Sequence, residues 1–168
     1  MNFVGIKDLA YFILAYGNVQ GFAITPLKLQ KILYYTQAWH IAKFNKHTLF
    51  DELPEAWVNG PVYKTIYHEF NNNFYRDTPL RLKDIDSRGD DILKERQEKL
   101  RINPEQLELV YTVVKHYSRM DGGKLVLLTH TDSPWNDARE GLGEFDRSDR
   151  NISIDSMYNF YNPKIAKS

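Results

Sequence analysis

The chain contains no cysteine, which excludes a disulfide framework and any metal site built from thiolates. It also carries no net charge, because 22 Lys and Arg residues balance 22 Asp and Glu residues. A protein that binds nucleic acid by broad neutralisation of phosphates needs an excess of positive charge. The balance therefore argues against nucleic acid as a partner, although it leaves room for a local basic patch.

Long apolar runs are missing as well. No run approaches the roughly 20 residues that a helix needs to span a bilayer, so we expect no membrane contact. Residues 1–8 show no basic segment followed by an apolar core, which is the pattern of a signal peptide. We therefore expect a cytoplasmic protein. No internal repeat is visible, and 168 residues suit one domain with a core of its own.

Aromatic residues are abundant, with 11 Tyr, 9 Phe and 3 Trp making up 14% of the chain. Most are expected to build the core. A share of the Tyr and Trp side chains suits a binding surface, where an apolar ring with a polar tip is favoured.

The stretch from residue 25 to residue 44 carries the clearest helix signals. Thr25 can cap the helix with its hydroxyl, and Pro26 suits the first helical position, where no backbone N–H is needed. On a wheel at about 100° per residue, apolar side chains occur on nearly all sides, which is typical of a buried helix. The predicted fold is therefore mainly α: a compact, single-domain helical bundle around this central helix.

Apolar spacing and capping residues predict further helices around it. Pro61 is interpreted as the start of a third helix, Asn103 as the cap of another, and Asn162-Pro163 as the stop of the last. The expected spans are 6–19, 61–70, 103–120, 124–129 (short and buried), 134–138 (capped by Asp132 or Ser133) and 155–161. At most a small β element is predicted, near 55–58 and 151–154.

Residues 76–101 differ from the rest in composition, with mixed charge and few large apolar groups. Such a segment is expected to be solvated and mobile. The alternative is an arm that becomes ordered on a partner. Ile92, Leu93 and Leu100 would let a short helix form within it.

No constellation of residues predicts catalysis. The five histidines include no pair at three- or four-residue spacing, so no metal site is expected, and His40 is interpreted as a hydrogen-bonded core residue. His130 and Ser133 lie too close in sequence for a nucleophile and its base. Thr129 and His130 are instead expected to fix a tight turn. We expect no catalytic residue and no cofactor.

An ordered set of segments resembles the Panacea domain family, which includes the SocA- and GepA-like proteins. The set comprises Leu27–Tyr35, Ala38-Trp39-His40, Ala56-Trp57 with Gly60-Pro61-Val62, and then Thr129-His130 with Pro134-Trp135, while residues 154–161 resemble the family's last helix. The resemblance implies an antitoxin domain that neutralises a partner toxin by direct binding. The toxin would be encoded by a neighbouring gene and would often be one that blocks protein synthesis.

The matched residues divide into an architectural group and a candidate binding group. Trp57 and Trp135 are predicted to be largely buried. The other architectural residues are Leu29, Leu33, His40, Gly60, Pro61, Thr129, His130 and Pro134. Lysines need water, so the flank of the central helix that carries them is predicted to be exposed and to bind the partner. That group is Lys28, Lys31, Tyr35 and Trp39, with Asn59 and Tyr63 at the next corner of the chain. The alternative is that Tyr35 and Trp39 pack under residues 76–101 while the two lysines are merely solvated.

Three functions follow from these observations. The first is a toxin-neutralising binding module, and the second is an adaptor that delivers a bound partner to a protease. The third class is a DNA-binding repressor or an enzyme, and the neutral net charge and the missing motifs argue against both. Rescue of growth supports the first, a shortened half-life of the partner supports the second, and a salt-dependent shift of operator DNA supports the repressor. The sequence does not indicate an oligomeric state.

Overall fold

The structure, a computed structural model, describes residues 3–71 and 78–165. These residues form a mainly helical protein with a small two-stranded antiparallel sheet, as the sequence predicted. The elements are, in chain order, α1 (Ile6–Gln20), α2 (Pro26–Lys43), β1 (Glu55–Trp57), β2 (Gly60–Val62), α3 (Lys64–Asn71), α4 (Ile85–Leu100), α5 (Pro104–Ser118), α6 (Gly122–Thr131), α7 (Ser133–Ala138) and α8 (Ile154–Ile165).

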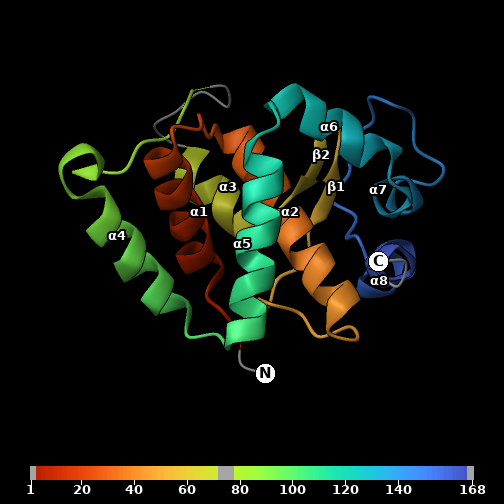
Figure 1. Ribbon diagram of the computed structural model, residues 1–168. Coiled ribbons are helices and arrows are strands. Elements are labelled where there is room, and N and C mark those ends of the chain that lie inside the picture. The colour runs from red at the N-terminus through yellow and green to blue at the C-terminus, as the bar shows by residue number, and fades with distance from the viewer. Residues whose placement is uncertain (1–2, 72–77, 166–168) are drawn as a thin grey trace.

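The helix α2 is the centre of the structure. The Thr25 hydroxyl accepts a hydrogen bond from the Lys28 amide at 3.1 Å, and Pro26 occupies the first helical turn, so the helix begins where its capping residues predicted. Nearly every side chain of α2 is buried. The helix contacts α1, α3, α5, α6, α8 and β2, and it runs through the middle of Figure 1.

The segment predicted to be charged and mobile contains the helix α4. It lies against α1 on the opposite side of the molecule from the hairpin (Figure 1), where Ile85 and Ile92 pack with Ala15 of α1. Arg88 interrupts its helical geometry, with φ −131° and ψ 27°. Residues 76 and 77 lie outside the described residues, and the mobility of the segment stays a prediction.

The strands β1 and β2 form a hairpin with Glu55 opposite Val62 and Trp57 opposite Gly60. The outer edge of β1 is covered by residues 150–152. The Ala56 amide donates to the Arg150 carbonyl, the Ile152 amide donates to the Pro54 carbonyl, both at 2.8 Å, and Glu55 forms a bridge with Asn151. The expectation of a small β element near 55–58 and 151–154 is thus confirmed.

Several predictions of element boundaries are wrong. Pro61 does not start a helix but lies in β2, and α3 begins at Lys64. Pro163 lies inside α8, near its C-terminal end, where a proline removes one backbone hydrogen bond without ending the helix. The helix α6 is not fully buried, because Leu127 is 65% exposed.

The residues before α7 also differ from the prediction. Thr129 and His130 belong to the last turn of α6 and not to a tight turn, and neither Asp132 nor Ser133 caps α7 through its side chain. No helix among the described residues is long and apolar enough to cross a membrane.

Candidate protein-binding site

A groove of about 770 Å³ opens beside the hairpin. A cavity of this size falls within the range of about 300–1,000 Å³ that is typical of ligand sites. Four parts of the chain form its walls: the first turn of α2, the hairpin, α3 and the loop at 147–149. The lining residues are Pro26, Leu27, Gln30, Glu55, Trp57, Val58, Asn59, Val62, Lys64, Ile66, Tyr67, Phe70, Arg147, Ser148 and Asp149.

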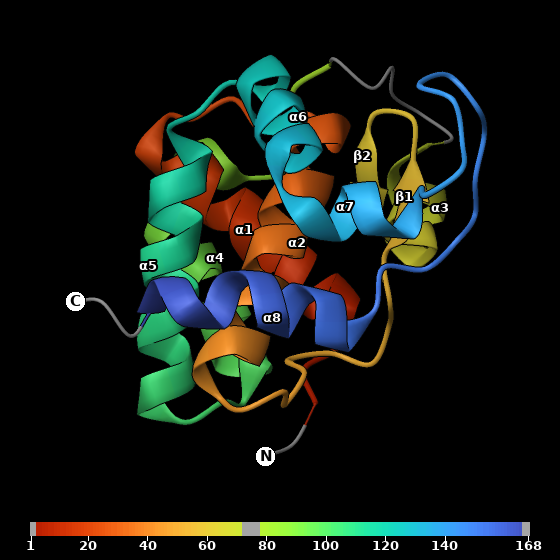
Figure 2. The same ribbon diagram turned by 90° about the vertical axis from the view of Figure 1, so that its right-hand side faces the viewer.

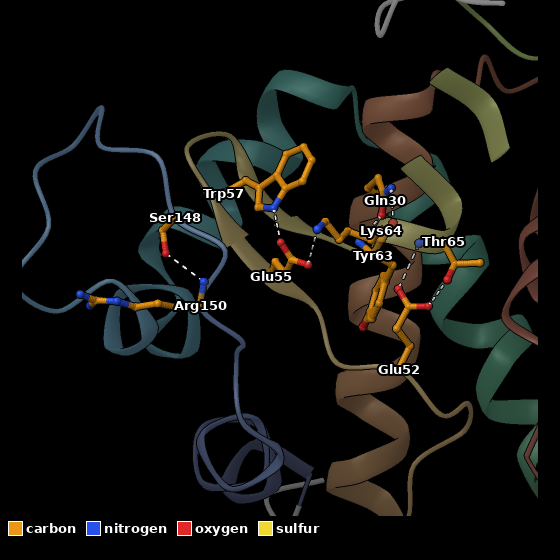
Figure 3. Close-up of polar contacts among 9 residues, drawn as sticks. All are labelled: Gln30, Glu52, Glu55, Trp57, Tyr63, Lys64, Thr65, Ser148 and Arg150. Atoms are coloured by element: carbon orange, nitrogen blue, oxygen red, sulfur yellow. Dashed lines mark hydrogen bonds and ion pairs between the residues drawn. The ribbon is translucent and has the colours of Figure 1, made fainter. Parts of the chain in front are cut away.

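Glu55 and Trp57 project from the same side of β1, because alternate residues of a strand share a face. The Trp57 Nε1–H donates to Glu55 Oε1 at 3.0 Å, and the Lys64 Nζ lies 4.0 Å from Glu55 Oε2. Figure 3 shows the carboxylate between the indole and the ammonium. Tyr67 of α3 stands edge-on to Trp57, with ring centroids 5.0 Å apart. The groove therefore has aromatic walls with a carboxylate set into them.

The central helix holds the hairpin through two side chains. The Gln30 side chain accepts from the Tyr63 amide at 2.8 Å and donates to the Tyr63 carbonyl at 3.1 Å (Figure 3). The Lys31 ammonium, which is 0% exposed, donates to the Pro61 carbonyl at 3.0 Å. These bonds occupy the outer edge of β2, and Pro61 offers no N–H there. Since residues 150–152 cover the edge of β1, a partner cannot extend this sheet and must be bound by side chains.

Gly60 is required by the way the hairpin meets α2 and α6. Its φ is +106°, which is a region that residues with a Cβ rarely adopt. A Cβ at this position would also lie 2.7 Å from Lys31 Cε and 2.8 Å from the Thr129 hydroxyl oxygen. Lys31 and Thr129 are therefore architectural: they form the surface on which the hairpin rests.

The short helix α7 supports the hairpin from the side opposite α3, as Figure 2 shows. The Trp135 indole N–H donates to the Trp57 carbonyl at 2.8 Å, and its ring stacks on His130 with centroids 4.0 Å apart. Burial lowers the pKa of His130, and the nearby Lys31 lowers it further, so the ring is neutral near pH 7. The buried Arg139 guanidinium donates to the Ala56 carbonyl at 2.9 Å.

The same arginine orders the loop that follows α7. Its guanidinium also donates to the Gly143 and Asp146 carbonyls, at 3.1 and 2.6 Å. These contacts lie on both sides of Phe145, which is 79% exposed, and the loop continues to the groove residues 147–149. One buried cation thus joins the Ala56 carbonyl of β1 to the loop that leads to the groove residues 147–149.

Among the architectural residues, the structure confirms the predicted burial of Trp135 and the core position of His40. Leu29, Leu33 and His40 are each 0% exposed, and Trp135 is 7% exposed. The His40 ring bonds to the His47 carbonyl at 2.7 Å and to the Gln106 side chain at 3.0 Å, which confirms a hydrogen-bonded core histidine. Trp57 is only half-buried and lines the groove, so its predicted burial is wrong.

The predicted exposed flank of α2 is wrong. Lys28 is 6% exposed, and its ammonium donates to the Ser118 carbonyl, while Tyr35 and Tyr63 are 1% and 0% exposed. Burial lowers the pKa of Lys28. Carbonyl oxygens from α5 and from the hairpin replace water around these lysines. Of the six predicted partner-binding residues, Trp39 and Asn59 are half-buried, and Asn59 lines the groove.

The tyrosines of α2 belong to a buried polar cluster around Asp132. The Tyr35 and Tyr161 hydroxyls donate to the same carboxylate oxygen of Asp132, at 2.9 and 2.7 Å. Tyr35 also stacks on Tyr117, whose hydroxyl accepts from the Trp39 indole at 2.8 Å. Burial raises the pKa of Tyr117 to about 12, so it stays neutral. The cluster joins α2, α5 and α8, and the Asp132 side chain makes no capping bond to α7.

The sequence did not single out α3 and the loop at 147–149 as parts of a site. The available signal was in α3, where Ile66 and Phe70 follow one face and Tyr67 lies beside them, so the helix is apolar on more than one side. Among residues 3–71 and 78–165, no group of three or more His, Cys, Asp or Glu side chains is arranged to hold a metal ion.

Comparison with models of protein families matches residues 29–136 to a family described as antitoxin SocA-like, Panacea domain. The matched region runs from within α2 to within α7 and contains the hairpin with Gln30, Lys31 and Trp135, whereas Arg139 and residues 150–152 follow it. Comparisons with curated proteins and with solved structures found no match.

Proposed function

The chain belongs to the Panacea domain family of SocA-like antitoxins, and from this membership we propose that it is an antitoxin that neutralises a protein toxin by binding it directly. The family match is the observation that carries the proposal, and it suggests a non-enzymatic role. The partner is a toxin encoded by an adjacent gene.

The groove supports the proposal because it has the make-up of a protein-binding surface. Its walls combine apolar and aromatic side chains, and charged residues of both signs lie at its rim. Interfaces typically have such an apolar, aromatic centre within a polar rim. The hairpin that carries Glu55 and Trp57 is fixed from behind by Lys31, Trp135 and Arg139, so the surface is organised before a partner binds.

The test is co-expression of the protein with the product of the neighbouring gene. The toxin alone should stop growth, and the pair should restore growth and co-purify as a complex. A matched control carries the same operon with an early stop codon in the antitoxin gene. If the two proteins neither co-purify nor restore growth, the proposal is wrong.

Direct neutralisation also predicts that the toxin persists. Its half-life, measured after synthesis is stopped, should be unchanged or longer when the antitoxin is present. A shorter half-life that depends on a cellular protease would show that the protein delivers the toxin for degradation, which would contradict neutralisation by binding alone.

A further inference from the structure

Among the described residues that line the groove, the most shielded charge is the carboxylate of Glu55. Its side chain is 13% exposed, whereas the Lys64 side chain is 57% exposed, and Arg147 and Asp149 are exposed. The charges of the rim are thus solvated and screened, and a group that enters the groove meets a negative charge within it. Charge complementarity therefore favours a cation on the partner.

The carboxylate keeps hydrogen-bonding capacity for such a cation. Two carboxylate oxygens offer about four acceptor positions. The Trp57 Nε1–H occupies one at 3.0 Å, and Lys64 lies at 4.0 Å, the outer limit of an ion pair. A pair with a solvated lysine contributes little free energy, so Lys64 can move aside at low cost.

Aromatic faces flank the carboxylate. Trp57 and Tyr67 meet at an interplanar angle of 66°, and Tyr67 is 37% exposed. A guanidinium is planar, stacks on such rings and bonds to a carboxylate through two parallel N–H groups, whereas an ammonium does neither. Beside these rings, Val62, Ile66 and Phe70 give the groove an apolar wall.

We propose that the groove binds an arginine side chain carried by an apolar segment of the toxin. The guanidinium pairs with Glu55 and stacks on Trp57 or Tyr67, and the neighbouring apolar side chains pack against the wall formed by Val62, Ile66 and Phe70. The segment binds through its side chains, since both edges of the hairpin are already occupied. This inference rests on the proposed function.

The first experiment measures the dissociation constant for the toxin that the protein rescues, by titration calorimetry with purified proteins. Glu55→Gln keeps the shape and the acceptor for Trp57 but removes the charge. We expect it to weaken binding about 10- to 100-fold, the range for a charged hydrogen bond at an interface. Tyr67→Ala should weaken binding by about 10-fold or more. The control is Glu98→Gln, at an exposed residue of α4, which should bind like wild type.

The second experiment identifies the chemistry on the toxin. Each surface arginine of the toxin is replaced by alanine, and the changes are combined with Glu55→Gln in double-mutant cycles. One arginine should show an effect that is not additive with Glu55→Gln, and its exchange for glutamate should be rescued by Glu55→Arg. Melting temperature and circular dichroism check that each variant is folded.

The outcomes separate the two proposals. A wild-type protein that does not bind the toxin overturns the proposed function and this inference with it. If folded Glu55→Gln and Tyr67→Ala proteins bind the toxin as tightly as wild type, the groove is not the binding site, while the proposed function stands. If these variants weaken binding but no arginine of the toxin is coupled to Glu55 in the double-mutant cycles, the inference that the groove binds an arginine is wrong. A protein that dimerises by itself, and loses the dimer with Glu55→Gln, would show that a second copy occupies the groove and would also overturn the inference.

Discussion

Replacing Trp135 by alanine tests whether α7 holds the hairpin in place. The side chain is 7% exposed, donates to the Trp57 carbonyl, stacks on His130 and lies 5.0 Å from the Arg139 guanidinium. Truncation of a large aromatic side chain in a core costs about 3–5 kcal/mol. It also removes the donor from a carbonyl at the base of the groove. We therefore expect a loss of about 4 kcal/mol in the free energy of unfolding, a large share of a domain's roughly 5–15 kcal/mol.

Urea unfolding followed by circular dichroism measures this loss. Trp135→Phe keeps an aromatic ring against His130 but removes the N–H donor, and it should cost about 1–2 kcal/mol. Trp57→Ala should cost less than Trp135→Ala, because the Trp57 ring is only half-buried. A Trp135→Ala protein within about 1 kcal/mol of wild type would refute the reasoning, since it would show that the hairpin does not depend on this contact.

Three further predictions concern pH, the hairpin and the surface. Burial lowers the pKa of His40 to about 4, against about 6.5 in the unfolded chain, so the unfolded state binds more protons between these values. Stability should therefore fall by up to about 3 kcal/mol as the pH falls from about 6.5 to about 4. The urea midpoint should change less with pH in this range for His40→Gln than for wild type, whereas the exposed His116→Gln should behave like wild type. An equal dependence of the midpoint on pH in all three proteins would show that His40 is not the cause. Gly60→Ala should lower the melting temperature more than Gly141→Ala, because both have positive φ but only Gly60 has atoms within 3 Å of a new Cβ; equal losses would contradict the close approach. Phe145→Ala should leave the free energy of unfolding within about 0.5 kcal/mol of wild type, because the ring is 79% exposed, and a larger loss would show that it packs within the protein.

Much of the helical fold could be predicted because its signals are local. The cap at Thr25, the proline after it and the apolar surface of α2 lie within one stretch, and the structure confirms a buried central helix. Asn103 and Gln106 form the capping box that starts α5, again from neighbouring residues. Local backbone preferences of this kind do not depend on the rest of the chain.

The predictions that proved wrong depend on contacts between residues that are far apart in the sequence. Lys28 and Lys31 were predicted to be exposed because charges need water, but carbonyls of Ser118 and Pro61 supply their partners, from distant parts of the chain. The sequence around Pro61 is typical of a helix start, but the positive φ of Gly60 turns the chain so that Pro61 lies in the second strand of a hairpin. A helical wheel contains no information about either arrangement.

The candidate site likewise has one part that neighbouring residues predict and another that depends on the fold. Glu55 and Trp57 are close in sequence, and their segment was predicted to be extended, so their shared face could be anticipated. The opposite walls come from α3 and from the loop at 147–149, about ninety residues further along the chain. Only the fold brings these parts together, so no sequence pattern indicated a groove between them.

The most direct test of the account uses purified components and no other protein. The proposed partner toxin is assayed for its own activity while the protein is added in increasing amounts, with protease absent. The account predicts that toxin activity falls to background as the protein approaches a stoichiometric amount, and that Glu55→Gln shifts this point to higher concentration. Full toxin activity in the presence of a large excess of the folded protein would contradict neutralisation by direct binding.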